Sequence, residues 1–223
     1  MDCSKTSMTN FRILLVVFTL TLFAACGVTQ PIRPIEAGKT EITASLGGPI
    51  IPVGDIAFPV PYLNLGAQYG IRQRLTLFGN THITALLFKD VGFDGGAAMR
   101  IVSEEGLRPD VTVNGRAYFF WDAFRGNSIR VYPAASVTAS YSMNTQSLLY
   151  FGVDNFLQLS DASIFVSPYV GYSFPISDNA MMQLESKLVA LNHDTRHGVF
   201  EGVASVAGRG NVGLYVGVQY SLE

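Results

Sequence analysis

The chain has 223 residues, a formal net charge of −2 and charged residues at only 14% of its positions. A slightly acidic balance argues against a nucleic-acid partner, which would require a basic patch. The charged fraction is also low for a protein whose whole surface meets water. No nucleotide-binding or catalytic motif stands out.

The first 27 residues have the composition of an export signal. Lys5 and Arg12 precede a short apolar run, Ile13–Phe23, which small residues follow at Ala24–Gly27. A basic start, an apolar stretch too short for a bilayer span and a small-residue cleavage site predict a signal peptide over residues 1–25. The residues just before Cys26 resemble a bacterial lipobox, which implies that Cys26 is acylated. Ordinary signal-peptidase cleavage near the alanine pair is the alternative.

The use of cysteine agrees with an anchored N-terminus. Cys3 lies within the predicted signal, so the mature chain keeps Cys26 alone and forms no internal disulfide. Residues 26–38 hold two prolines and no alternation, and we predict an extended, lipid-anchored tether there. Residues 39–223 are long enough for one domain with a large core.

From residue 39 onward, segments of about ten residues alternate apolar with polar side chains, as strands do when their two faces meet different surroundings. No helical period is long enough to place a helix. We predict strands at Thr40–Gly47, Tyr62–Gly70, Arg74–Phe88, Phe93–Val102, Asp110–Trp121, Ser128–Tyr141, Ser147–Phe156, Ser163–Phe174, Met181–Leu191 and Asn211–Leu222.

The connections between these strands alternate between short and long. Ile71–Arg72 is a tight polar turn, whereas Gly48–Pro61 and Asn192–Gly210 are long loops. This asymmetry is typical of bacterial outer-membrane barrels, and an even number of strands places both termini at the short-turn end. We therefore predict a single antiparallel transmembrane β-barrel of ten strands, with both termini periplasmic. Twelve strands is the alternative, if Ile50–Val60 and Gly198–Ala207 each contribute one.

Aromatic residues gather on the apolar face near the strand ends. Tyr and Trp favour membrane interfaces because the ring is apolar while its polar tip stays wet. The alternative is that these are core aromatics that happen to lie at strand ends. We expect two aromatic girdles, one at the short-turn end from Tyr69, Tyr141, Tyr172, Phe174 and Tyr220, and one at the opposite end from Phe119 and Trp121.

The polar face carries charges of both signs among small polar residues. Such a set can neutralise itself inside a narrow lumen, where unpaired charge is costly. We therefore predict that the polar face points inward. The predicted lumen charge network consists of Glu41, Arg74, Asp94, Arg100, Asp110, Arg116, Arg130, Asp154, Glu185 and Lys187.

Four of these charges predict how the strands on either side of Ser103–Leu107 align. If the numbers of facing residues sum to 210, Asp94 faces Arg116 and Arg100 faces Asp110. Opposite charges that face one another across strands stabilise a sheet by roughly 0.2–1 kcal/mol each. A slip of one residue would turn every charge toward lipid.

Few residues suggest chemistry. His82 lies on the predicted lumen face as a member of the polar network, and His193, Asp194 and His197 fall in a long loop. Some ten-stranded outer-membrane proteases use an Asp–His pair at the extracellular mouth. Their barrels extend above the membrane, and the other outer loops of this chain are too short to form such an extension. The spacing of the two loop histidines ligates metal on a helix, and no helix is predicted there. We expect no enzyme activity, cofactor or metal.

As a whole, the chain from residue 39 onward resembles the small bacterial outer-membrane β-barrel proteins. The resemblance implies a place in the bacterial outer membrane, with membrane lipids and the barrel-assembly machinery as partners. We expect a largely plugged barrel with a structural or surface-recognition role toward an extracellular ligand or envelope partner. A narrow pore for small solutes is the second hypothesis, because a ten-stranded wall is near the size that side chains fill. An enzyme with its site at the mouth is the third.

Overall fold

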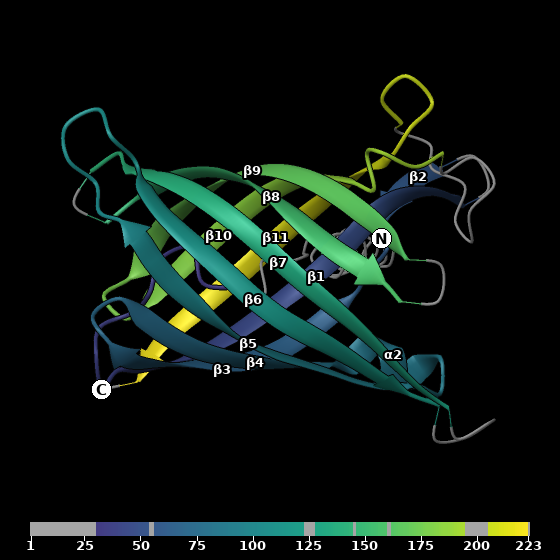
Figure 1. The fold of residues 1–223 in the computed structure, drawn as a ribbon, viewed down its shortest axis with the longest axis horizontal. Coiled ribbons are helices and arrows are strands. Elements are labelled where there is room, and N and C mark those ends of the chain that lie inside the picture. The colour runs from purple at the N-terminus through teal and green to yellow at the C-terminus, as the bar shows by residue number, and fades with distance from the viewer. Residues whose placement is uncertain are drawn as a thin grey trace, which may run out of the picture.

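The computed structural model describes residues 30–53, 56–122, 128–144, 146–159, 162–194 and 205–222. Ten strands of this part of the chain form one antiparallel sheet, which closes into a barrel because β11 pairs with β1 (Figure 1). The predicted all-β, single, ten-stranded barrel is confirmed. The barrel strands are β1 (Thr40–Val53), β3 (Leu63–Arg72), β4 (Leu75–His82), β5 (Val91–Val102), β6 (Asp110–Trp121), β7 (Ile129–Ser142), β8 (Leu148–Gln158), β9 (Ser163–Ser177), β10 (Ala180–Val189) and β11 (Asn211–Leu222).

The short strand β2 (Ile56–Pro59) lies outside the closed ring. It pairs with the far end of β1, at Ile50–Val53, and prolongs that strand as a hairpin beyond the barrel (Figure 1). The described residues therefore form ten barrel strands and not the alternative twelve. Most of Gly198–Ala207, the other segment considered for that count, lies outside the described residues.

The shortest turns and the longest connections occupy opposite ends of the barrel, as the sequence predicts, but the β5–β6 connection (residues 103–109) is longer than the β8–β9 connection (159–162) at the other end. Thr40 pairs with Leu222 on one side and with Tyr69 on the other, so the two ends of the barrel sequence meet at the short-turn end. The longer connections, including the one between β10 and β11, lie at the opposite end, which we call the loop end (Figure 1).

The predicted strand Arg74–Phe88 is wrong over its second half. β4 ends earlier, and Ile83–Leu87 form the short helix α2. The hydroxyl of Thr84 accepts a hydrogen bond from the backbone N of Leu63 (2.7 Å) and donates one to the backbone O of Pro61 (3.1 Å), which fastens the helix to the start of β3. The prediction was wrong because the apolar residues of this helix alternate as those of a strand do, and five residues are too few to show a helical period. Within the described residues, no helix is long and apolar enough to cross a membrane.

The barrel is polar inside and apolar outside. Thr76 and Ser136 are 0% and 2% exposed, whereas their neighbours Leu77 and Val137 are 46% and 49% exposed. The predicted inward direction of the polar face is confirmed. Other buried polar side chains include Thr43, Ser45, Gln68, Asn80, Thr112, Asn114, Thr138, Ser140, Ser173 and Gln183, and other exposed apolar ones include Ile42, Leu65, Met99, Phe151, Val153, Val170, Leu184 and Leu214.

Two lumen glycines leave room for buried tyrosines. A Cβ at Gly152 would collide with the ring of Tyr169, and a Cβ at Gly171 would collide with the ring of Tyr150. Tyr150 is fully buried and Tyr169 is 5% exposed. These large rings fill part of a lumen that ten strands would otherwise leave hollow.

The register predicted between β5 and β6 is wrong by two residues. Over most of the pairing the numbers of facing residues sum to 212, so that Asp94 faces Tyr118. A slip of two keeps every side chain on its face. Both ion pairs still form, diagonally: Arg116 Nη1 lies 3.6 Å from Asp94 Oδ1, and Arg100 Nε lies 2.7 Å from Asp110 Oδ2. Because a long side chain reaches a diagonal neighbour, matched charges specify the face more sharply than the register.

Candidate functional site

Residues Gln30–Ile35, which the sequence assigns to an extended tether, lie inside the lumen; we call them the N-terminal plug. They contain no helix or strand, as an extended segment should, but Gln30 and Ile32 are each only 5% exposed. Ile32 belongs to a buried cluster with the rings of Tyr150 and Tyr169. The plug therefore forms part of the core of the domain.

The first plug residue, Gln30, joins two distant strands. Its Oε1 accepts a hydrogen bond from Arg116 of β6, and its Nε2 donates one to the hydroxyl of Tyr169 of β9 (3.4 Å). Both partners lie near the middle of their strands. The plug thus extends from the short-turn end to about the mid-height of the lumen.

Arg33 fastens the plug to the wall at the short-turn end. Its guanidinium donates to Ser140 Oγ (2.7 Å) and to Glu104 Oε2 (2.9 Å), and its Nε lies 3.9 Å from Asp110 Oδ2. Hydrogen bonds that involve a charged group contribute about 1.5–3 kcal/mol each. Arg33 therefore makes polar contacts with two side chains of the wall and with Glu104 in the adjoining turn.

Toward the loop end, the lumen holds an acid with an amide, a guanidinium and an imidazole close to it. Asp94 Oδ1 accepts a hydrogen bond from Asn80 Nδ2 (2.9 Å) and lies near Arg116, while Asp94 Oδ2 lies 2.9 Å from His82 Nε2. Asp94, Arg116 and His82 are all at most 7% exposed. The prediction that His82 belongs to the polar network is consistent with these contacts.

A second cluster surrounds the one lysine of the predicted network. Lys187 Nζ lies 3.1 Å from Asp154 Oδ2 and 3.5 Å from Glu185 Oε1. The ammonium also lies 5.2 Å from the ring centroid of Tyr169 and 5.4 Å from that of Tyr215. Its charge is therefore balanced by two carboxylates and two ring faces.

Three predicted network residues lie away from these clusters. Arg74 is exposed in the turn between β3 and β4. Arg130 is exposed near the loop end, where it pairs with Asp90 (2.8 Å). Glu41 accepts a hydrogen bond from Gln68 Nε2 (2.9 Å) on the lumen face of β1.

The cation missed by the sequence analysis is Arg33. With Arg74 and Arg130 at the rims, the buried acids of the predicted network outnumber its buried bases. Arg33 supplies part of the missing positive charge, to Asp110 and Glu104. The sequence offered one signal, a single arginine between two prolines. The segment has no alternation of apolar and polar residues, so its arginine could not be assigned to a face.

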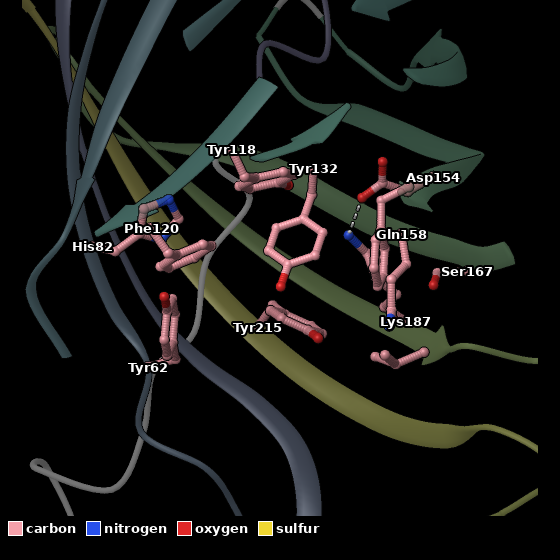
Figure 2. A pocket seen from close by; sticks show the side chains of 12 residues that line it. Tyr62, His82, Tyr118, Phe120, Tyr132, Asp154, Gln158, Ser167, Lys187 and Tyr215 are labelled. Atoms are coloured by element: carbon pink, nitrogen blue, oxygen red, sulfur yellow. Dashed lines mark hydrogen bonds and ion pairs between the residues drawn. The ribbon is translucent and has the colours of Figure 1, made fainter. Parts of the chain in front are cut away.

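A cavity of about 640 Å³ opens toward the loop end, above the plug; we call it the mouth cavity (Figure 2). Figure 2 shows the rings of Tyr62, His82 and Phe120 on one side of it and the polar side chains of Asp154 and Lys187 on the other. The described residues that line it are Tyr62, His82, Tyr118, Phe120, Tyr132, Asp154, Phe156, Gln158, Ser167, Lys187, Val189 and Tyr215.

Of the two loop histidines, the structure describes His193. No group of three or more potential metal ligands occurs among the described residues. His193 stacks on Phe165, with ring centroids 4.2 Å apart, and its Nε2 lies 3.2 Å from the backbone O of Ile164. Asp194 follows in the same loop, and His197 lies outside the described residues.

The predicted girdle residues lie on the outer face at the two ends of the barrel. At the short-turn end, Tyr69, Tyr172 and Tyr220 are 47%, 37% and 48% exposed. There, Phe174 stacks with Tyr172 at 5.8 Å, and the hydroxyl of Tyr141 donates to the backbone O of Leu107 (3.0 Å).

At the loop end, Trp121 is 42% exposed. Phe119 of the same strand stacks on Phe93, with ring centroids 5.1 Å apart. The outer face thus has rings at both ends and aliphatic side chains between them.

No protein-family model matches the chain, and no curated protein matches it at a significant level. The fold and the arrangement of side chains therefore carry the functional argument.

The contacts of Glu104 predict a pH dependence of the plug anchor. Hydrogen bonds from the side chain and backbone of Ser142, followed by Arg33, lower the pKa of this carboxyl. A lowered pKa stabilises the folded state above the ordinary value of about 4.3, and that contribution is lost as the pH falls through the folded pKa. We expect the Ser142 amide resonance to titrate with a midpoint below about 4.3. Glu104→Gln should abolish the titration, and a midpoint at or above the ordinary value would contradict the assignment.

Replacing the buried acid Asp94 should cause a large loss of stability. Asp94→Asn removes the carboxylate near Arg116, and breaking a buried ion pair on one side costs about 3–5 kcal/mol. Asp90→Asn removes an equal charge from the exposed pair with Arg130, which should cost at most about 1 kcal/mol. Urea unfolding in a zwitterionic detergent measures both. Equal effects of the two variants would show that Asp94 carries no special share of the stability.

Proposed function

We propose that the protein is a bacterial outer-membrane β-barrel whose lumen is sealed by its own N-terminal segment. The single observation that carries this proposal is the inverted burial, with polar side chains inside a closed barrel and apolar ones on its wall. An apolar wall exposed to water would aggregate, whereas in a bilayer it meets hydrocarbon. A closed ring also leaves no unpaired strand edge, which a membrane requires.

The two ends of the wall support the same proposal. The rings at both ends, with aliphatic residues between them, fit the interfaces and the hydrocarbon layer of a bilayer. A strand climbs about 2.5 Å per residue at the usual tilt, so ten to twelve residues span the roughly 25 Å apolar band. The barrel sequence begins and ends at the short-turn end, which in such barrels is the periplasmic side.

The signal-like N-terminus supports export, and lipids and the barrel-assembly machinery are the partners that follow. The role we propose is structural or in recognition at the cell surface, without a catalytic step. The Arg33 anchor and the buried Ile32 support a seal and argue against an open pore.

The test uses the refolded mature chain. A closed barrel in dimethylamine-oxide detergent should migrate differently on a gel before and after boiling, show a β-type circular-dichroism spectrum, and insert into liposomes. The intact protein should give no steady conductance in a planar bilayer. Solubility without detergent together with unchanged migration would indicate a soluble barrel, and steady conductance would favour the pore.

A further inference from the structure

We propose that the mouth cavity binds a neutral saccharide. The inference depends on the cavity and not on the membrane, so it can fail while the outer-membrane barrel stands. Its volume of about 640 Å³ lies in the range of small-molecule sites, roughly 300–1,000 Å³.

One half of the cavity is lined by aromatic rings. The ring of His82 lies 5.6 Å from that of Tyr62 and 5.2 Å from that of Phe120, tilted by 52° and 45°. Tyr132 meets Phe120 and Phe156 edge-on, with centroids 6.2 and 6.3 Å apart. The rings form a curved wall and not a closed stack, so ring surface remains to contact a ligand.

The other half of the cavity is polar and combines an acid with a base. Asp154 accepts hydrogen bonds and Lys187 donates them, 3.1 Å from each other. A hydroxyl group both donates and accepts. Two neighbouring hydroxyls can therefore bind the carboxylate and the ammonium at once and leave the ion pair intact. A sugar ring offers such hydroxyls on its edge and apolar C–H groups on its face.

The same features disfavour other small molecules. A hydrocarbon chain would bury the Asp154–Lys187 pair without offering it any further hydrogen bond, and Val189 is the single aliphatic residue of the described lining. An anion gains little from Lys187, which two carboxylates already balance. Within the lining itself, Asp154 and Lys187 are one acid beside one base, so a cation also meets the ammonium there, and choline tests this alternative.

Binding is tested on the mature chain in dimethylamine-oxide detergent, because glycoside detergents would compete. The probes are glucose, N-acetylglucosamine, maltose and lactose, with choline, 2-naphthol and phenylalanine as comparators. Saturation-transfer NMR and calorimetry measure binding. We expect saturable binding of at least one sugar, weakened about tenfold or more by Tyr132→Ala and by Asp154→Asn.

The controls separate the site from the fold. Tyr132→Phe keeps the ring and should retain most of the affinity. Tyr141→Ala removes a tyrosine from the outer face at the short-turn end and should bind as the parent does. Heat-modifiable migration verifies that each variant is folded. The proposal is overturned if no sugar binds, if the lining variants leave sugar binding unchanged, or if a comparator binds in the sugar's place.

Discussion

Deleting Gln30–Ile35 is expected to turn a silent barrel into one that gives discrete conductance steps. The deletion removes the buried Ile32 from its contacts with Tyr150 and Tyr169, and it removes the Arg33 bonds to the wall. The lumen beside these residues is lined by small polar side chains such as Ser140, which water can solvate. Planar-bilayer recording of the intact and deleted chains measures the difference.

A single substitution should loosen the same seal. Arg33→Glu replaces the cation that faces Glu104 and Asp110 with a like charge, and losing one charge-assisted bond already shifts opening by about tenfold or more. A Ser140→Cys reporter in a Cys26→Ser background should then react at least that much faster with a charged thiol reagent. Arg130→Glu inverts a charge at the opposite rim and should leave the rate unchanged. A deleted chain that folds, stays silent and keeps Ser140→Cys protected would show that the wall alone seals the lumen.

Alternation was enough to predict the barrel because each strand separates two solvents along its whole length. β6 and β11 begin and end where the pattern places them, at Asp110–Trp121 and Asn211–Leu222. The prediction of α2 as a strand was wrong at the rim, where the chain no longer separates two different surroundings. Ile83–Leu87 lie at the rim of the barrel. There, the short helix that Thr84 holds against β3 has both buried and exposed residues, so its sequence pattern resembles that of a strand. The predicted register of β5 and β6 was wrong because a shift of two residues costs little free energy. The arginine side chains are long enough to pair with the aspartates diagonally across the strands.

The site was harder to predict than the wall. Lumen charges could be assigned to a face, and most were, but the plug has no period to read. Its arginine acquires a role only once Glu104, Asp110 and Ser140 are brought to one end of the barrel. The mouth cavity depends on rings from β4, β6, β7 and β8, whose convergence follows from closure and not from any local motif.

The predicted acylation of Cys26 and the seated plug should exclude one another. Gln30 is four positions after Cys26, and a fully extended chain spans about 14 Å over four residue steps. Gln30 is bonded to Arg116, which lies six residues from one end of β6 and five from the other. At a climb of about 2.5 Å per residue, either rim is roughly 12–15 Å away. The extended chain between Gln30 and an acylated Cys26 would therefore be just long enough to reach the rim. It would be too short to pass over the rim and place the acyl chains in the lipid outside the barrel.

We therefore expect the lipidated protein to have an unseated plug and the unlipidated protein a seated one. Palmitate labelling that Cys26→Ser abolishes would establish the anchor. Ser140→Cys should then react with the thiol reagent in the lipidated chain and be protected in a chain that begins at Gly27, because Arg33 covers Ser140 only in the seated state. Equal protection in both would show that the anchor reaches lipid with Gln30 in place. Absence of palmitate on a normally matured chain would leave ordinary cleavage and a permanently sealed barrel.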